Sequence, residues 1–244
     1  MTKPQILISA GEASGEMYAA RLTAALRRHA DLHAFGLGGP RMREASVELL
    51  AECSEIAAVG VTEVFGKVPA VWRLLRKLTR EAARRRPRVA ILVDSPAFNL
   101  RLARRLRPHG VRNVYFIGPQ VWAWRPRRVN LIRRRFERVI CIFPFEEELY
   151  RRANVPVDFV GHPLVDQVRP KMSRAEFASR YNLEAAQPIL ALLPGSRTGE
   201  LAHHLPTMLE ACRLLEPKRS YQLDRKSTRL NSSHIQKSRM PSSA

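Results

Sequence analysis

The fold is decided by the stretch Val89-Ala90-Ile91-Leu92-Val93-Asp94-Ser95-Pro96. An apolar run without a polar interruption is typical of a strand that is buried on both faces of a parallel sheet. Pro96 ends the run because it has no N–H to donate to a neighbouring strand. Asp94 is therefore expected at the carboxyl edge of the sheet, where α/β proteins bind their ligands.

Similar apolar runs alternate with helical patterns on both sides of this strand. We expect further strands at Gln5–Ser9, Leu32–Leu37, Val114–Ile117, Arg138–Ile142, Val157–Val160 and Ile189–Leu193. We expect helices near Gly15–His29, Val68–Arg85, Asn99–Arg107, Arg127–Arg134 and Glu146–Ala153. This alternation predicts an α/β fold with a Rossmann-type parallel sheet flanked by helices.

The pattern is interrupted between Gly161 and Met172 and then resumes. Ser173 with Glu176 three positions later predicts a capping box at a new helix. We therefore predict a Rossmann-like domain at residues 1–168 and the truncated start of a second one at 169–223. Residues 224–244 are serine-rich and have no hydrophobic period, so we expect a disordered, non-native tail that resembles translated adaptor sequence.

The composition of the chain excludes several classes of protein. Hydrophobic residues make up 45% of the chain, which excludes wholesale disorder, and the net charge is +20. The three cysteines, Cys53, Cys141 and Cys212, match no zinc or disulfide spacing. No apolar run approaches the roughly 20 residues of a spanning helix, and the first one is too short for a signal peptide. These features favour a cytosolic protein with an anionic partner or with ordinary solvated arginines.

Two glycine-containing loops are suited to anions. Gly11 and Gly15 allow a tight turn at a helix N-terminus, where free N–H groups favour negative charge. The alternative for this loop is a plain turn capped by Ser14. Gly195 and Ser196 form a second small cradle, in which Arg197 could pair with a diphosphate. Neither loop has a dinucleotide or P-loop motif.

Two further motifs could carry chemistry. Asp94 at the mouth of a cleft could act as a general base toward a sugar hydroxyl, or it could only cap the following helix. Trp122 and Trp124 point the same way in an extended segment. They could form a wall for an acyl chain or a sugar face, with Arg125 near a phosphate. The alternative is a pair of core aromatic residues beside a basic helix.

A membrane contact is a further hypothesis. The apolar run Val59–Trp72 contains Val64, Phe65 and Val68, and an arginine-rich helix follows it. An apolar stretch beside a basic helix is typical of proteins that lie on anionic bilayers. The alternative is an internal strand, loop and helix with a solvated basic face.

Taken together and in order, these segments closely resemble the lipid-A-disaccharide synthases, bacterial glycosyltransferases of family 19. The matching text is AGEASGE (Ala10–Glu16), GGPRM (Gly38–Met42), VGVTEVFG (Val59–Gly66), DSPAFN (Asp94–Asn99), GPQVWAWRPRRV (Gly118–Val129), PFEEELY (Pro144–Tyr150), VGHPLVD (Val160–Asp166) and LLPGSR..E (Leu192–Glu200). Each short match alone is weak evidence for the family, but all of them in this order over some 200 residues are specific to it.

The resemblance implies a GT-B fold, in which two Rossmann-like domains face each other across a cleft, with no metal or cofactor. It implies that the 6-hydroxyl of 2,3-diacylglucosamine 1-phosphate (lipid X) attacks UDP-2,3-diacylglucosamine. The products are the lipid A disaccharide 1-phosphate and UDP, with inversion, in lipopolysaccharide biosynthesis. The implied partners are these two substrates and the cytoplasmic surface of the inner membrane, with a homodimer in the full-length protein and no nucleic acid.

The resemblance also implies roles for individual residues. Asp94 would be the base and Arg197 a diphosphate or acceptor-phosphate contact, while the cleft would be lined by Glu12, Ser14, Asn99, Trp124, Arg125 and His162. Glu16 departs from the aspartate usual in the family. Almost all of the nucleotide-binding domain is missing, so we do not expect this chain to turn over alone.

Two rival functions remain open at this point. One is another GT-B enzyme, a UDP-N-acetylglucosamine-using transferase or epimerase, which would not need the apolar run Val59–Trp72. The other is a non-catalytic basic α/β module that binds nucleic acid. The sequence lacks the reader motifs and the aromatic-interleaved basic strands that such a module would carry.

Overall fold

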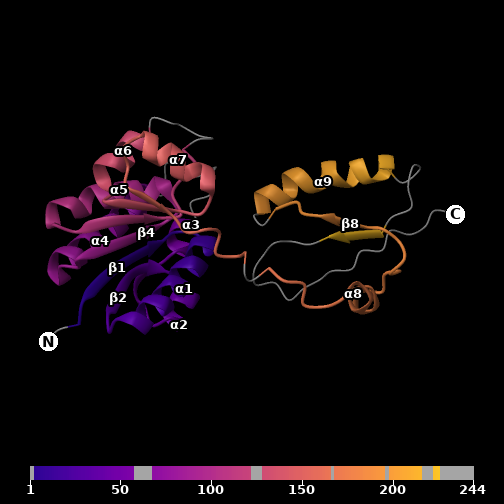
Figure 1. Cartoon of the computed structure of the whole chain (residues 1–244), viewed down its shortest axis with the longest axis horizontal. Coiled ribbons are helices and arrows are strands. Elements are labelled where there is room, and N and C mark those ends of the chain that lie inside the picture. Colours follow the sequence, from indigo (N-terminus) through magenta and orange to yellow (C-terminus); the bar gives the residue numbers. More distant parts are fainter. Residues whose placement is uncertain are drawn as a thin grey trace. The chain divides into compact units, whose positions relative to one another are not determined.

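The computed structural model describes residues 3–57, 68–121, 128–165, 168–195, 198–215 and 222–225. The chain divides into two compact units, Met1–Val168 and Arg169–Ala244 (Figure 1).

A parallel sheet of seven strands forms the centre of the first unit. The strands are β1 (Gln5–Ala10), β2 (His33–Gly38), β3 (Glu48–Glu52), β4 (Val89–Val93), β5 (Arg112–Phe116), β6 (Arg138–Cys141) and β7 (Val157–Phe159). Their order is β3-β2-β1-β4-β5-β6-β7, and every neighbouring pair is parallel. The order reverses between β1 and β4, so the predicted Rossmann-type sheet is confirmed.

Helices cover both faces of this sheet. The helices are α1 (Ala13–His29), α2 (Pro40–Glu44), α3 (Ser54–Ala57), α4 (Val68–Arg85), α5 (Pro96–Leu106), α6 (Arg128–Arg135) and α7 (Pro144–Arg152), with the short turn η1 (Arg107–His109) after α5. Figure 1 shows α1 and α2 on one side of the sheet and α5, α6 and α7 on the other. Two separate hydrophobic clusters, one on each face, hold these layers together.

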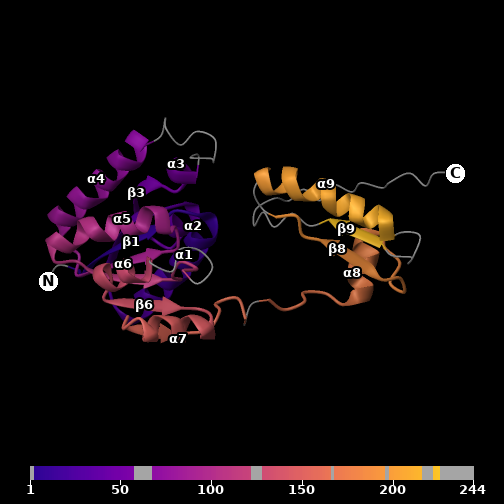
Figure 2. The ribbon, with the colours of Figure 1, turned by 90° about the horizontal axis from the view of Figure 1, so that it is seen from above.

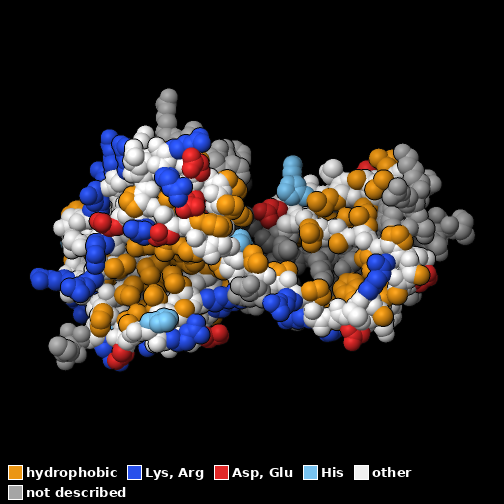
Figure 3. All heavy atoms as spheres, in the orientation of Figure 1, with side chains coloured by type: hydrophobic (Ala, Val, Ile, Leu, Met, Phe, Trp, Pro, Cys, Tyr) orange, Lys and Arg blue, Asp and Glu red, His pale blue; other side chains and the backbone are white. Residues whose placement is uncertain are grey.

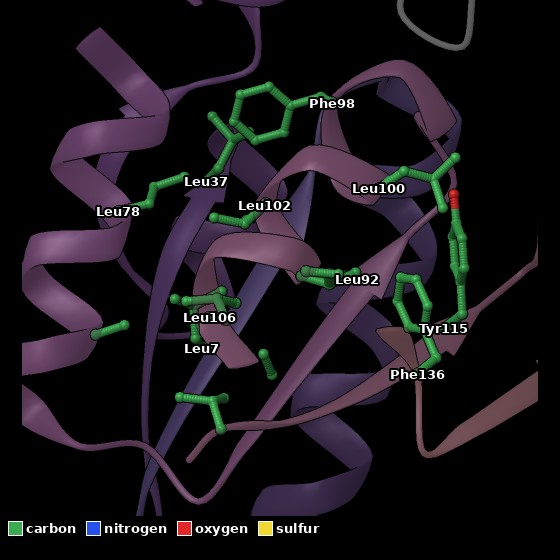
Figure 4. Close-up of a cluster of buried hydrophobic side chains, with 14 of the residues drawn as sticks. Leu7, Leu37, Leu78, Leu92, Phe98, Leu100, Leu102, Leu106, Tyr115 and Phe136 are labelled. Atoms are coloured by element: carbon green, nitrogen blue, oxygen red, sulfur yellow. The ribbon is translucent and has the colours of Figure 1, made fainter. Parts of the chain in front are cut away.

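Strand β4 shows why its sequence is apolar without alternation. Leu92 points into the cluster with α4 and α5, whereas Ile91 and Val93 point into the cluster with α1. Both faces of the strand are therefore buried, as in other sheets covered by helices on both sides. Figure 4 shows Leu78 of α4 and Leu102 of α5 turned toward this strand and its neighbours.

The second unit is a small α/β assembly. It contains α8 (Arg174–Tyr181), β8 (Ile189–Leu192), α9 (Thr198–Leu215) and β9 (Gln222–Arg225), and β8 and β9 pair in parallel. The predicted capping box is confirmed at the start of α8. The Glu176 N–H donates to Ser173 Oγ at 3.3 Å, and the Ser173 N–H donates to Glu176 Oε2 at 2.6 Å.

The structure corrects the sequence-based expectations in two places. Strand β3 and the short helices α2 and α3 were not expected. Asp224 and Arg225, which we expected in the disordered tail, form the end of β9 opposite Ala191 and Leu192. Strand pairing uses backbone groups, so a composition argument about side chains does not detect it. Residues 226–244 lie outside the described residues.

The central position of Leu92 predicts a large effect of truncation. Leu92 is wholly buried, whereas Val165 in the same unit is 71% exposed. Leu92→Ala should lower the free energy of unfolding by about 2–5 kcal/mol, because it leaves a cavity. Val165→Ala should change it by less than about 0.5 kcal/mol. Urea denaturation followed by circular dichroism measures both, and equal losses would contradict the burial described here.

Candidate functional site

The reversal of strand order places two loops side by side. The loop after β1 leads to α1 on one face, and the loop after β4 leads to α5 on the other. The carboxyl ends of two strands at such a reversal are where open α/β sheets usually bind their ligands. Ala10 and Val93 are register partners at the ends of these strands. A Cβ on Gly15 would lie only 3.7 Å from Asp94 Cβ. The first glycine loop and the Asp94 motif therefore belong to one site.

The backbone at this edge is strained. Asp94 and Ser95 have φ values of 49° and 43°, and Ile117 at the end of the adjacent β5 has a φ of 58°. A residue other than glycine held in the left-handed region costs about 1–3 kcal/mol and persists only where its surroundings fix it. Such strain is concentrated at functional sites, which makes the turn at Asp94 the centre of the candidate site.

Asn99 fixes the Asp94 turn from beneath. Its Nδ2 donates to the carbonyl oxygens of Asp94 at 2.8 Å and Val93 at 2.9 Å. Its Oδ1 accepts a hydrogen bond from Ser9 Oγ at 2.8 Å, which ties the end of β1 to the start of α5. The expectation that Asn99 lines the cleft needs correction here, because the side chain is wholly buried and acts as a support.

Tyr115 is the second support of this turn. Its hydroxyl donates to the Asp94 carbonyl oxygen at 3.1 Å, and its ring stacks on Phe136 (Figure 4). Burial, followed by the negative charge of Asp94, raises the pKa of Tyr115 well above its usual value. The hydroxyl therefore stays protonated and remains a donor throughout the physiological pH range. Sequence reasoning had not identified Ser9 or Tyr115, although Ser9 is a polar residue in an otherwise apolar buried strand.

The turn does not have the geometry of a simple helix cap. The residue at the N-cap of α5 is Ser95, and its side chain makes no capping hydrogen bond. The Ser95 Oγ is buried and has no hydrogen-bond partner among the described residues. Asp94 itself is half-buried at the carboxyl end of β4. This arrangement favours the interpretation of Asp94 as a functional side chain.

The loop after β1 is shaped by Glu16. The N-cap of α1 is Glu12, so the alternative that Ser14 caps this helix is wrong. The buried Glu16 carboxylate accepts the Arg41 N–H at 2.7 Å, at the start of α2. A Cβ on Gly39 would lie 2.7 Å from Glu16 Oε1. Gly39 therefore provides the room for the Glu16 carboxylate.

His162 is brought to the same edge from the far end of the sheet. Its ring lies 6.2 Å from the Tyr18 ring on α1 and 5.8 Å from the Phe143 ring after β6. Its Nδ1 accepts the Leu164 N–H at 3.2 Å. Burial raises the pKa of Tyr18, which keeps this neighbour neutral. The structure thus brings together Glu12, Ser14, Asp94 and His162 at one edge of the sheet.

Several predicted site residues cannot be placed. Trp122, Trp124, Arg125, Ser196, Arg197, Val64 and Phe65 lie outside the described residues, as does the side chain of Val68.

Gly195, in the second unit, has a φ of 115°, and a Cβ there would lie 2.6 Å from Glu200 Oε2, so this turn requires glycine. Trp72 is half exposed, with the Arg105 guanidinium 4.5 Å from the centre of its ring.

The described residues contain neither a membrane-spanning helix nor a cluster of metal ligands. None of the described helices is both long and apolar enough to cross a membrane. Nor do three or more His, Cys, Asp or Glu side chains in the described ranges gather where they could hold a metal ion.

Comparison with known proteins identifies relatives of the whole chain. The model of a family described as lipid-A-disaccharide synthetase matches residues 6–236. Lipid-A-disaccharide synthases of Solibacter usitatus and Myxococcus xanthus are each 48% identical to the chain, over 209 and 217 residues. The matches cover 85% and 88% of this chain but 55% and 57% of the relatives. The chain therefore spans just over half the length of the curated relatives.

Solved structures share the fold at low sequence identity. A putative UDP-N-acetylglucosamine 2-epimerase from Listeria monocytogenes is 12% identical with a TM-score of 0.61, and covers 92% of this chain and 62% of its own. The calicheamicin glycosyltransferase CalG4 is 15% identical with a TM-score of 0.51, over 92% of this chain and 66% of its own. These likenesses concern the fold alone and confirm the expected GT-B type.

The role of Asn99 generates a prediction about stability. Asn99→Leu keeps the volume but removes the Asn99 partner of the Val93 carbonyl oxygen and of the Ser9 hydroxyl, and it leaves the Asp94 carbonyl oxygen with Tyr115 alone. Each buried group left unsatisfied costs about 1–3 kcal/mol. Ser9→Ala removes a single donor and should cost distinctly less. Chemical denaturation measures both variants, and an Asn99→Leu protein as stable as the parent would show that the amide is not a support.

Proposed function

The chain belongs to the lipid-A-disaccharide synthetase family, and from this membership we propose the following function. The chain is the acceptor-side domain, with the start of the nucleotide-sugar-binding domain, of an inverting glycosyltransferase. The enzyme joins UDP-2,3-diacylglucosamine to 2,3-diacylglucosamine 1-phosphate and releases UDP. The family match over residues 6–236 is the observation that carries the proposal.

The proposed reaction needs a proton acceptor beside the attacking 6-hydroxyl. As the 6-oxygen bonds to the anomeric carbon, the bond to UDP breaks and the hydroxyl proton passes to a base. Asp94 suits this role because it follows β4 at the carboxyl edge of the sheet and its backbone is fixed by Asn99 and Tyr115. Glu12, Ser14 and His162 at the same edge would contact the sugar.

The negative charge that develops on the departing UDP needs a counter-charge. Arg197 lies in the sequence between β8 and α9, after Gly195 and Ser196, and an arginine there would suit a diphosphate. Trp122, Trp124 and Arg125 would add apolar and phosphate contacts to the substrates. The substrate roles of all these residues are part of the proposal.

We also propose that α4 faces an anionic membrane surface. Its outer side lines a basic groove of about 580 Å³ whose described lining residues are Arg73, Arg76, Lys77, Thr79, Arg80, Ala83, Arg105 and His109. No carboxylate is among these lining residues, and Figure 3 shows basic side chains along the outer edge of this unit. Clustered cations beside the half-exposed Trp72 support peripheral binding at the cytoplasmic face of the inner membrane. A homodimer of the full-length protein remains a further part of the proposal.

The role of Asp94 can be tested in a full-length chimera. Residues 6–215 of this chain replace the matching part of the Solibacter usitatus relative, and UDP release and disaccharide formation are measured. Asp94→Asn should lower kcat by about 10²–10⁴-fold, because the loss of the base is felt in the transition state. KM and the melting temperature should change little. Arg197→Ala should instead raise KM as well as lower kcat, since it removes a contact to a phosphorylated substrate.

Two outcomes would contradict this assignment. An active chimera whose Asp94→Asn variant keeps near-normal kcat would show that the base lies elsewhere, with Glu12 or His162 the next candidates. An unsubstituted chimera that folds but forms no disaccharide would contradict the proposed function itself.

The membrane proposal is tested by sedimentation with vesicles that contain anionic phospholipid. Replacing Arg73, Arg76 and Arg80 by glutamate should remove binding, because each basic residue contributes about 1 kcal/mol near such a surface. Replacing Val64, Phe65 and Val68 by serine should weaken binding without unfolding the chain. The matched control replaces the exposed Arg28, Arg88 and Arg112 by glutamate and should retain binding. Equal losses in the control, or unfolding of the serine variant, would refute a specific membrane face.

A further inference from the structure

Three consecutive helices of the first unit enclose a groove. Helix α4 precedes strand β4, α5 follows β4 directly after the Asp94 turn, and α6 follows β5. Figure 2 shows these helices in succession. The groove between them has a volume of about 740 Å³. It starts at Pro96 and Ala97, in the first turn of α5, and continues along that helix to Arg104 and Arg105.

The floor of this groove is apolar. Its carbon surface comes from Trp72 and Leu75 of α4, Pro96, Ala97 and Leu100 of α5, and Leu131 of α6. The volume lies within the range of roughly 300–1,000 Å³ that is typical of pockets for small ligands. Such a floor favours a hydrocarbon chain over a polar ligand, because the free energy of binding there would come mainly from the burial of apolar surface.

The rim of the groove is positively charged. Its charged members are Arg101, Arg104, Arg105, Arg128 and Arg135, and its described lining residues include no carboxylate. Burial, followed by the positive charge of Arg104, lowers the pKa of Arg135. Arg135 Nη1 donates to the Leu100 carbonyl oxygen at 3.0 Å, which fixes its guanidinium beside the floor. Gathered like charges repel one another, and a bound anion would relieve that cost through charge-assisted hydrogen bonds.

An apolar floor with a cationic rim fits an anionic amphiphile. We propose that the groove holds one acyl chain of the phosphorylated glycolipid substrate, with an anionic group of that molecule against the arginines. This inference rests on the proposed function and extends it, because the groove begins two residues after Asp94 and would lead the chain away from the reacting sugar. It is separate from the proposed membrane face on the outer side of α4, with which it shares the lining residue Arg105.

Isothermal titration calorimetry of the chain tests the groove directly. The probes are dodecyl phosphate below its micellar concentration, dodecyl maltoside as a neutral chain, and inorganic phosphate as a head group alone. Dodecyl phosphate should bind saturably at one site per chain. The maltoside should bind at least about 10-fold more weakly, because a charge-assisted hydrogen bond is lost. Inorganic phosphate should give no binding at the same concentration.

Variants locate the binding site. Ala97→Phe fills the groove from an exposed position, and Arg104→Glu reverses one charge on its rim. Each should weaken dodecyl phosphate binding by about 10-fold or more. Arg28→Glu, at an exposed position that lines neither groove, is the matched charge-reversal control and should bind like the parent. Parent-like binding in both groove variants, or inorganic phosphate binding as tightly as dodecyl phosphate, would overturn the inference. Thermal melting confirms that each variant is folded.

The active chimera separates this inference from the proposed function. Ala97→Phe should lower kcat/KM for substrates with long acyl chains much more than for short-chain analogues. An equal loss for both chain lengths would overturn the acyl-chain assignment while leaving the proposed reaction intact. A chimera that is inactive before any substitution contradicts the reaction, whereas calorimetry on the chain itself still decides whether the groove binds an anionic amphiphile.

Discussion

The candidate site depends on the hydrogen bonds between the Asn99 amide and the turn at Asp94. In one buried group, Asn99 links the end of β1 through Ser9 to the carbonyl oxygens at the end of β4. Tyr115 adds a second donor to the Asp94 carbonyl. These bonds hold two successive left-handed residues that the chain would otherwise avoid. They fix the position of the Asp94 backbone. A catalytic base needs such a fixed position if its carboxylate is to meet a substrate hydroxyl at hydrogen-bond distance.

Much of the fold follows from patterns that a single sequence carries. The run Val89–Val93 is apolar on both faces because helices cover both sides of the sheet, and its boundaries match those of β4. The capping box at the start of α8 could be predicted because Ser173 and Glu176 are three residues apart in the sequence. Strand β3 was not predicted, because the glutamates at both of its ends leave an apolar run of only three residues, Leu49–Ala51. Position at the edge of the sheet is not the reason, since the opposite edge strand β7 lies within the predicted range Val157–Val160.

The candidate site was only partly predictable. Asp94 could be placed because a buried strand ends there and the sheet edge is the usual ligand side. Asn99 was expected to line the cleft, but its side chain is buried beneath the turn. Sequence spacing does not indicate which of these two directions a side chain takes. The contribution of Tyr115 depends on the neighbouring strand β5 and is visible only in three dimensions. The groove along α5 likewise arises from three helices, and its arginines appear in the sequence as an ordinary basic composition.

The central claim is that a fixed turn presents the Asp94 carboxylate to the attacking hydroxyl of an acylated sugar phosphate. The most direct measurement is a crystal structure of the full-length chimera with 2,3-diacylglucosamine 1-phosphate bound. We expect a distance of about 2.6–3.2 Å between an Asp94 carboxylate oxygen and the 6-oxygen of the sugar. We also expect the Asn99 and Tyr115 hydrogen bonds to the Asp94 carbonyl to persist. A 6-oxygen bound by another carboxylate or by His162, with Asp94 turned away, would contradict this role of Asp94.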